Sequence, residues 1–532
     1  MVVALGVLVV TSLLLAAVYV AVDSSVQQSQ RDLNGQRAYY AARAGENAFL
    51  YQLNQNPSYW DTCSNDYQPT ATAVPGSTTG GMYSYVPVYN AGYSNSSCTT
   101  ANAISALIDP NTGTLRMEFT GYSGPTNASG VPSVQRTLVA SFRKPTPLDY
   151  LWYTDHEMED PQLNSNCTGE KYYWQYTSGV PSTIANNCEI NWITGDTMYG
   201  PMYTNDQYLI YSGASPVFGR AGSTDQIESS APETSVCVSS SCQKAKFNGD
   251  GALAGADPVE MPQSVSSTQL LADATANDGA NDSVFTGTTT INLTSGGGAT
   301  ISNCPGTTSA AACTTGWVNT TVASLPPIIY VQSGSSCPST YSASTYATNA
   351  QGQYYGACGD VYVHGYYTQP LTIVSDHDII IMANTSGLSN PGLTTTVDSN
   401  GNLTGGATLG LVAGDFVRVM HAAGVTPTAV TIDAAILTLA HSFMVDNYSN
   451  GSAPTAPKLT VNGAIAQRYR GIVGTVAGAG YVKNYTYDDR LKVLLPPYLF
   501  SISTAGWEVS RETLCTPSTS TSNTASCAYQ GP

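Results

Sequence analysis

The first 22 residues form one uninterrupted apolar stretch. No side chain from Met1 to Val22 ionises, and the only polar ones are Thr11, Ser12 and Tyr19. At about 1.5 Å per residue, a helix of this length covers about 33 Å, against a hydrocarbon core about 30 Å thick. The pattern therefore predicts a helix that is able to span a membrane.

Helical periodicity continues beyond the apolar stretch. Larger side chains recur three, four or seven positions apart from Val26 to Tyr51, polar residues fill the other faces, and no proline occurs before Pro57. The pattern predicts one helix of about 55 residues, about 80 Å long. Small side chains also gather along it, which would let helices approach closely. These are Ala38, Ala41, Ala42, Ala44, Gly45 and Ala48.

After the helix, the composition shifts to Ser, Thr, Asn, Gly and Tyr, which favours strands and turns. Between residues 56 and 145, the runs MYSYVPVYNAGY, AISALIDPNTGTLRMEFTGYSG and SVQRTLVASFRKP predict a small antiparallel sheet, with DPNTGT as a hairpin turn. A long helix (1–55) followed by such a head (56–145) predicts the α+β class.

The remainder of the chain is expected to be mostly β. Residues 146–358 combine short strands, long loops and several cysteines without a regular pattern. In residues 359–513, β-branched runs recur about every 20–35 residues between Gly, Asn and Asp turns, which predicts a parallel β-helix, or β-solenoid. An antiparallel β-sandwich is the alternative. Residues 514–532 are expected to form a C-terminal tail closed by a disulfide.

Twelve cysteines fall into neighbouring pairs. Their even number favours disulfides, and no Cys-X-X-Cys pair indicates a zinc or thioredoxin-like site. Disulfides imply an oxidising, extracytoplasmic location for the chain after the apolar stretch. The first basic residues, Arg31, Arg37 and Arg43, also follow this stretch, and basic residues usually mark the cytoplasmic side of a membrane span. The two signals therefore conflict. Removal of a short basic leader just before Met1 would reconcile the two. The neighbours that can pair locally are Cys63 and Cys98, Cys167 and Cys188, Cys237 and Cys242, Cys304 and Cys313, Cys337 and Cys358, and Cys515 and Cys527.

Charge and motifs give little support for catalysis. The net charge of −17 argues against nucleic-acid binding. Polar groups gather at Asp376, His377 and Asp378 and around His156, and a strand would place Asp376 and Asp378 on one face. A solvated turn between two strands is the simpler interpretation. The other candidates for acid–base chemistry are Asp433, His441 and Asp446, and nothing in their spacing selects them.

No P-loop, Gly-X-Ser-X-Gly, His-Glu-X-X-His or EF-hand motif occurs. We therefore expect no catalytic residue, no cofactor and no metal site.

Asn-X-Ser/Thr sequons are frequent, as expected for a chain rich in Asn, Ser and Thr. Glycosylation would suit an exposed extracellular surface. The candidate sites are Asn95, Asn127, Asn292, Asn319, Asn402 and Asn484.

The uncharged N-terminal stretch and its amphipathic continuation, QRAYYAARAGENAFLYQLNQNPSYW, resemble the N-terminus of type IV pilins, in particular the bacterial PilX-like family. The runs TIDAAILTLAHSFMVDNY and LTVNGAIAQRYRGIVG resemble the β-solenoid region of some actinobacterial members. One position departs from the family pattern, because most pilins have glutamate at the fifth mature position, where this chain has Leu5.

The resemblance implies a structural, non-enzymatic subunit of an extracellular, pilus-like filament on the cell surface. A prepilin peptidase would remove the leader, the subunit would wait in the inner (cytoplasmic) membrane, and the pilus assembly machinery would extract it into a homopolymer. The helix residues that this resemblance places in the filament core are Val3, Leu5, Val9, Leu14, Val18, Leu33, Tyr40, Ala44, Ala48 and Tyr51.

Two alternatives remain at this point. The first is a minor, tip-located pilin or adhesin whose solenoid binds glycans or surfaces. The second is a membrane-anchored β-helix enzyme that acts on polysaccharides, for which several acidic or basic groups would have to converge on one groove.

Overall fold

The computed structural model describes residues 2–56, 59–77, 80–109, 113–127, 130–169, 171–176, 181–232, 236–262, 267–278, 282–304, 317–335, 337, 357–383, 388, 390–399, 401–422, 425–449, 456–492, 494–499 and 506–515. The chain divides into two compact units. The first contains Met1–Pro110, Thr114–Lys144 and Gly506–Pro532, and the second contains Asn111–Gly113 and Pro145–Ala505.

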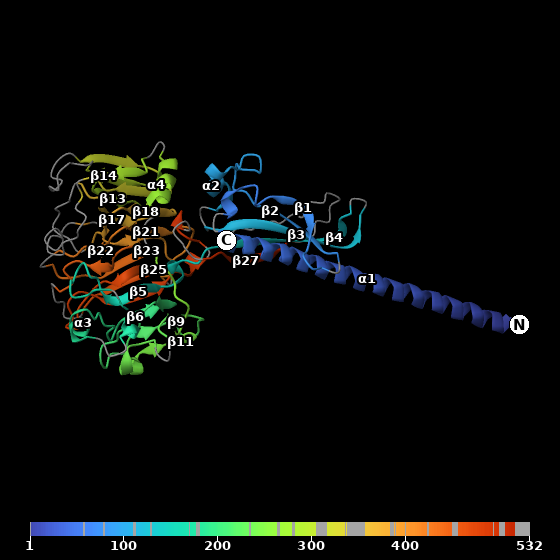
Figure 1. The fold of residues 1–532 in the computed structure, drawn as a ribbon, viewed down its shortest axis with the longest axis horizontal. Helices are drawn as coiled ribbons and strands as arrows, with labels where there is room; N and C mark the ends of the chain where they lie inside the picture. Colours follow the sequence, from blue (N-terminus) through green and yellow to red (C-terminus); the bar gives the residue numbers. More distant parts are fainter. Residues whose placement is uncertain are drawn as a thin grey trace. The chain divides into compact units, whose positions relative to one another are not determined.

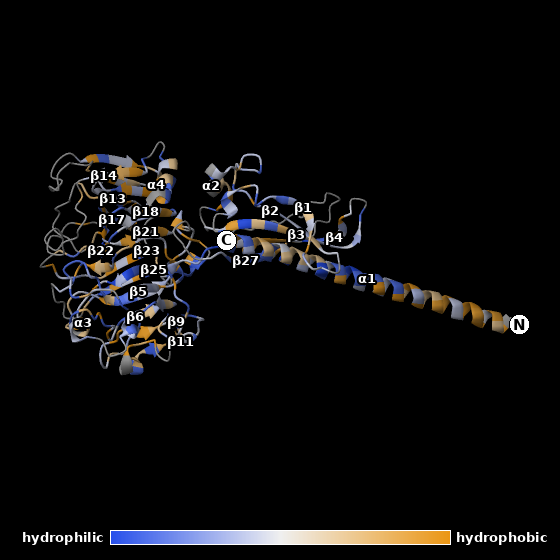
Figure 2. Ribbon diagram, in the orientation of Figure 1, coloured by the Kyte–Doolittle hydropathy of each residue, from blue (hydrophilic) through white to orange (hydrophobic). Residues whose placement is uncertain are grey.

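The first unit begins with one long helix, α1 (Val2–Gln55), which confirms the helix predicted from the periodicity. Every side chain from residue 3 to residue 33 is exposed. Figure 2 shows this half of the helix to be hydrophobic over its first turns and more polar near its middle. The C-terminal half is different, because one of its faces is buried.

The buried face of α1 packs against the sheet of the same unit. Its small residues, including Ala38 and Ala42, let the helix backbone approach the sheet closely, and Phe49 and Leu53 fill the space farther along. The rings around Phe49 belong to Tyr85, Phe119 and Phe142, with centroids 5.3, 6.0 and 5.5 Å away. Burial of one such aromatic side chain stabilises the folded state by about 1.5–3 kcal/mol.

The sheet of the first unit has the order β1-β2-β3-β4-β27, and all its pairings are antiparallel. Its last strand comes from the far end of the chain. Glu512 of this strand accepts a hydrogen bond from Tyr39 of α1, and the backbone of Trp507, just before the strand, exchanges hydrogen bonds with the Asn54 side chain. The strands are β1 (Gln68–Ala73), β2 (Met82–Pro87), β3 (Leu115–Thr126), β4 (Pro132–Arg143) and β27 (Glu508–Leu514).

One predicted strand in the head is wrong. The run that starts at AISAL forms a short helix, α2 (Ala103–Leu107), after the 3-10 helix η2 (Thr100–Asn102). Ala103, Ala106 and Leu107 are buried, and their spacing of three and four is that of a helix face. Another 3-10 helix, η1 (Tyr59–Asp61), follows α1.

The second unit is built mainly from short parallel strands stacked on one another (Figure 1). Its longest parallel ladder runs, in spatial order, through β12 (Val284–Thr286), β16 (Ile328–Gln332), β18 (Leu371–Ser375), β21 (Leu409–Ala413), β23 (Val430–Thr438), β25 (Lys458–Arg470), β5 (Trp152–Glu159), β7 (Met202–Thr204), β9 (Gln226–Ser229) and β11 (Gly251–Ala254).

Further parallel ladders lie beside the first. One joins β13 (Thr289–Leu293), β17 (Val361–Tyr366), β19 (Ile379–Ile381), β22 (Val417–Val419) and β24 (Phe443–Val445). Another joins β26 (Val482–Tyr487), β6 (Thr197–Tyr199), β8 (Val217–Phe218) and β10 (Lys246–Phe247), and β20 (Leu393–Thr394) pairs with β17 and β23. Only β14 (Ala299–Asn303) and β15 (Val318–Val322) add antiparallel pairings between the described strands of this unit.

Chain order and stacking order differ in the second unit. The first strand to enter the stack, β5, pairs with β25, the strand in the middle of the longest ladder, and the chain then runs to β11 at one end. It returns through α4 (Ser267–Ala276) to β12 at the other end and fills the stack back to β26. The remaining short helices are α3 (Ser182–Asn187), η3 (Pro147–Asp149), η4 (Tyr173–Gln175), η5 (Ser239–Lys244) and η6 (Asp489–Lys492).

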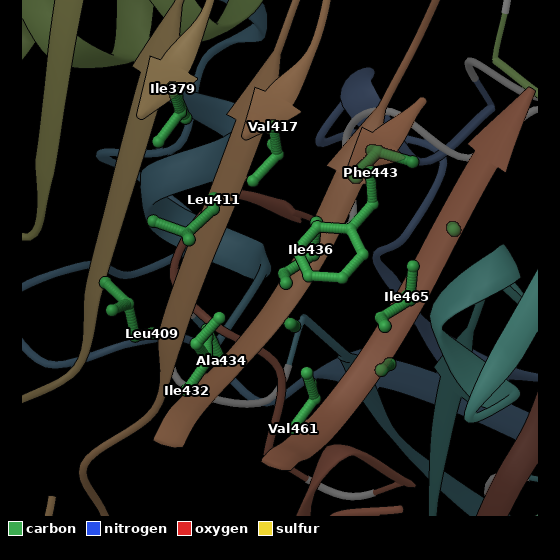
Figure 3. Packing of buried hydrophobic residues seen from close by; sticks show 14 of the residues in the cluster. Ile379, Leu409, Leu411, Val417, Ile432, Ala434, Ile436, Phe443, Val461 and Ile465 are labelled. Atoms are coloured by element: carbon green, nitrogen blue, oxygen red, sulfur yellow. The ribbon is translucent and has the colours of Figure 1, made fainter. Parts of the chain in front are cut away.

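The core of the second unit consists of aliphatic side chains that repeat from strand to strand. Ile436 of β23 lies in register with Leu411 of β21 and with Ile465 of β25. Figure 3 shows these side chains in the same interior as Phe443 and Val417 of the neighbouring ladder. Parallel strands buried on both faces require such continuous β-branched runs, which explains the composition of this part of the sequence.

Four disulfides lie among the described residues: Cys63 with Cys98, Cys167 with Cys188, Cys237 with Cys242, and Cys337 with Cys358. Two further predicted pairs, Cys304 with Cys313 and Cys515 with Cys527, each include a cysteine outside the described residues. The α+β prediction is confirmed.

Candidate functional site

The N-terminal half of α1 is an apolar surface of the first unit. Its large side chains are exposed, from 81% for Val3 to 52% for Val9. Among the described residues, α1 is the one helix long and apolar enough to cross a membrane. Most predicted core residues of the helix are therefore free to contact another molecule, whereas Ala44 and Ala48 are half-buried. The exposed ones are Val3, Leu5, Val9, Leu14, Val18, Leu33, Tyr40 and Tyr51.

The C-terminal half of α1 is fixed to β27 by a polar cluster. The Tyr39 hydroxyl donates to Glu512 at 2.8 Å, and Arg43 Nε lies 3.4 Å from the same carboxylate. Arg43 also lies 3.6 Å from Glu46, whose side chain is buried. Burial and the charge of Glu512 raise the pKa of Glu46. This cluster links the first helix of the chain to its last described strand.

Several of the charged residues singled out in the second unit lie at turns between consecutive strands. His377 and Asp378 occupy the turn between β18 and β19, and His441 occupies the turn between β23 and β24. These turns adjoin because the flanking strands are paired in register, and backbone bonds such as Gly414 N to Ser375 O at 2.9 Å continue into them. Stacking thus brings together residues that lie tens of positions apart in the chain.

Asp415 connects the two histidines of this corner. It lies 3.3 Å from His377 Nε2 and 3.9 Å from His441 Nε2. The other ring nitrogen of His377 lies 2.5 Å from Asp360, and that of His441 lies 3.0 Å from Asp160. Each imidazole therefore lies between two carboxylates, which ties successive turns together.

A buried guanidinium extends the same group. Arg418 Nε lies 3.0 Å from Asp378, and its Nη1 lies 2.8 Å from Asp446. We call this set the charged cluster. Its members are Asp160, Asp360, His377, Asp378, Asp415, Arg418, His441 and Asp446.

The carboxylates of the charged cluster hold the histidines in their cationic form. Burial disfavours the charged imidazole of His377, but Asp360, Asp378 and Asp415 outweigh it and raise the pKa to about 10. Burial also disfavours the charged imidazole of His441, but the nearby carboxylate of Asp160 outweighs burial and raises the pKa of His441.

Other predicted residues lie outside the charged cluster. Asp376 accepts hydrogen bonds from the Tyr330 hydroxyl and from the backbone N–H of Ser333, and it lies in a turn, which the sequence analysis preferred to a strand that would pair it with Asp378. Asp433 accepts from Thr395 N and from Asn462. These residues thus stabilise loops and strand ends.

His156 belongs to a separate aromatic column. Its ring stacks between Tyr172, at 4.6 Å, and Tyr469, at 5.2 Å, and Tyr172 stacks in turn on Trp174. Burial lowers the pKa of His156. The sequence placed this histidine in an acidic run, but its environment is predominantly aromatic.

Sequence reasoning missed Asp160, Asp360, Asp415 and Arg418. A signal was present, since polar turns interrupt apolar runs at corresponding places in LTIVSDHDIIIM, ATLGLVAGDFVRVM and ILTLAHSFMV. Aligning these runs would have placed Asp415 beside His377 and His441.

A polar cavity of about 510 Å³ lies elsewhere in the second unit. Arg220 bridges Asp225 and Asp489 at its wall, and Arg490 pairs with Asp488. Asn402, one of the predicted glycosylation sites, also lines it. Its charged groups pair with one another.

The predicted glycosylation sites differ in exposure. Asn95, Asn127, Asn319 and Asn402 are exposed, so an oligosaccharide could reach them. The two half-buried ones are Asn292 and Asn484.

Comparisons with known proteins give a limited result. No family model matches the chain, and no curated protein matches it. Among solved structures, the chain is similar to the competence-associated pilin ComZ from Thermus thermophilus, with 11% sequence identity and a TM-score of 0.26, covering 91% of this chain and 98% of that one. A TM-score of 0.26 is too low to establish a common fold.

Proposed function

We propose that this chain is a structural, non-enzymatic, pilin-like subunit that polymerises through α1 into an extracellular filament. The observation that carries the proposal is the contrast within α1. Its N-terminal half exposes apolar side chains at every turn, and its C-terminal half is packed against an antiparallel sheet. A surface of this kind needs either lipid or other helices around it.

The energetics support two successive environments for the helix. At about 25 cal/mol per Å², hiding on the order of 1,000 Å² of apolar surface is worth about 25 kcal/mol relative to water. Relative to lipid the gain is far smaller, because lipid tails are as apolar as leucine. Transfer from the inner membrane into a filament would therefore need an assembly machine, and cleavage by a prepilin peptidase would precede it.

The second unit suits the exposed surface of such a filament. We infer that its parallel ladders are the faces of a β-helix, because consecutive strands pair with the strands of the neighbouring coil. Disulfides and exposed sequons agree with an extracellular location. The resemblance of the N-terminal helix to that of PilX-like proteins is part of this proposal.

A charge in the apolar half of α1 tests the proposal. Val9→Asp places a carboxylate in a segment that must enter lipid and then a helix bundle, at a cost of about 2.5–3.5 kcal/mol at the centre of a membrane. We expect filaments sheared from the producing cells to fall at least tenfold by electron microscopy. Mass spectrometry of the sheared material should identify this chain as the repeating subunit in the wild type.

Gln30→Asp is the matched control, because Gln30 is exposed on the polar part of the same helix. It should leave filament number unchanged, and the disulfides of both variants should form as in the wild type. Normal filaments from Val9→Asp would contradict the proposal. A chain found only in trace amounts in purified filaments would instead favour a tip pilin.

A further inference from the structure

Three members of the charged cluster have potential metal-ligand atoms that lie close together. Asp360 precedes β17, and His377 and Asp378 form the turn between β18 and β19. One ligand atom from each lies within 4.8 Å of the other two. All three side chains are buried, with exposures of 1%, 6% and 0%.

A carboxylate oxygen at this place lacks a partner. Oδ2 of Asp360 is buried and has no hydrogen bond within the described part of the chain. The other oxygen of this group faces His377 Nδ1 at 2.5 Å. A buried carboxylate oxygen without a donor is costly, and a cation is the partner that satisfies it best.

The local charge also favours a cation. Asp360, Asp378 and Asp415 surround His377, and the nearest fixed positive charge, Arg418, is shared between Asp378 and Asp446. Negative charge therefore exceeds fixed positive charge at this buried corner.

His377 is oriented as a ligand by a second carboxylate. Its Nε2 lies 3.3 Å from Asp415, whose carboxylate can accept a hydrogen bond from the N–H at that position. Nδ1 then faces Asp360, and a metal ion would take the place of the proton shared there. A carboxylate behind a ligating histidine is the common arrangement in metal sites.

We propose that Asp360, His377 and Asp378 bind one zinc ion, which joins the start of β17 to the turn between β18 and β19. One imidazole nitrogen with carboxylate oxygens suits zinc, whereas calcium prefers six to eight oxygens. Cys337 and Cys358 also lie near His377, but their disulfide removes the thiolates. The sequence motifs indicated no metal site, and this site is independent of filament assembly.

Metal analysis of the full-length protein in detergent tests the proposal. The protein is stripped with chelator, dialysed against micromolar Zn²⁺ without reductant, and analysed for metal content. We expect one zinc per chain. Asp360→Asn and His377→Gln should each weaken zinc binding by at least about 100-fold. Loss of a group that only hydrogen-bonds to a ligand lowers metal affinity by about 10–100-fold, and loss of the ligand itself should cost more.

Two matched controls lie close to the site. Asp376→Asn changes a neighbouring carboxylate that is held by Tyr330 and Ser333, and His441→Gln changes the other histidine that faces Asp415. Both should bind zinc as the wild type does. Circular dichroism and disulfide mapping verify that each variant is folded.

X-ray absorption of the wild type gives a result that depends on no variant. It should show nitrogen and oxygen ligands at about 2.0–2.2 Å, including an imidazole, and no sulfur at about 2.3 Å. The proposal would be overturned if the protein held no stoichiometric zinc, if sulfur were bound to the zinc, or if folded Asp360→Asn bound zinc as tightly as the wild type.

Discussion

Asp66 is a buried residue that makes the stability of the first unit depend on pH. It lies in the loop after η1, its side chain is fully buried, and neither carboxylate oxygen has a hydrogen bond among the described residues. Burial, with a smaller contribution from Asp61, raises its pKa to about 9. Asp66 is therefore neutral in the folded protein at neutral pH.

The sign of the effect follows from proton linkage. The folded pKa of about 9 lies above the ordinary value of 3.8, so the folded state binds more protons between these pH values. The contribution of Asp66 to the free energy of unfolding is fully present below about pH 4 and is lost as the pH rises towards 9. Asp66→Asn removes this loss, and we expect it to raise the free energy of unfolding at pH 8 by about 1–3 kcal/mol.

Urea denaturation at pH 5 and pH 8 measures this effect. The stability gain of Asp66→Asn should be larger at pH 8 than at pH 5. Asp32→Asn, on the exposed part of α1, should change the unfolding free energy by less than about 0.5 kcal/mol at either pH. Equal gains at both pH values would mean that Asp66 is ionised when folded.

The candidate chemistry was only partly predictable at this scale. His377 and Asp378 were singled out as part of a polar cluster and His441 and Asp446 as further acid–base candidates, and all four lie in the charged cluster. Their partner Asp160 lies 281 residues before His441 in the chain. No local pattern indicates which distant turn becomes a neighbour, because that depends on the register of the strands between them.

At the scale of elements, close contact between α1 and β3 holds the head together. A Cβ atom added to Gly121 of β3 would lie 1.9 Å from the backbone oxygen of Ala38 and 2.3 Å from the nitrogen of Ala42. Both contacts are with backbone, so a side chain there must push the helix away from the sheet. Glycine at position 121 is thus required by packing rather than by its dihedral angles.

Gly121→Ala should destabilise the head by about 1–3 kcal/mol or more, as expected for an overpacked core. Hydrogen–deuterium exchange of peptides from β3 and from α1 would report it, because faster exchange there measures the stability of this unit separately from the second. Gly6→Ala is the control, since a Cβ at Gly6 meets no atom within 4 Å. Equal stability of the two variants would show that α1 is not seated on β3 as described.

Helix and strand positions followed from periodicity more readily than their partners did. The 54-residue helix and most strands of the head are where the pattern placed them. The pairing of β4 with β27 and of β25 with β5 had no counterpart in the sequence analysis. Both join segments more than 300 residues apart, and hydrophobic alternation identifies a strand without naming its neighbour.

At the scale of the whole chain, the second unit is an insertion into the first. The chain leaves the head sheet after β4 and returns as β27, which pairs with β4. Arg143 and Glu508 are register partners there, and their side chains form an ion pair at 3.0 Å. Register partners in an antiparallel pair have Cα atoms about 4.5–5.5 Å apart, a gap that a tight turn closes.

This topology predicts that the head folds without the second unit. Replacing residues 145–505 by a turn of about four residues keeps α1, the disulfide between Cys63 and Cys98, and the contacts of Glu512 with Tyr39 and of Trp507 with Asn54. We expect the excised protein in detergent to form this disulfide and to unfold in one cooperative step.

A chain that stops after Lys144 is the matched comparison. It lacks β27, which leaves one edge of β4 unpaired and removes the acceptor Glu512 from Tyr39 and Arg43. It should be the less stable of the two by several kcal/mol, since a whole edge strand and its contacts with α1 are lost. If both chains unfolded at the same urea concentration, β27 would contribute nothing to the stability of the head, and its pairing with β4 would have no structural role.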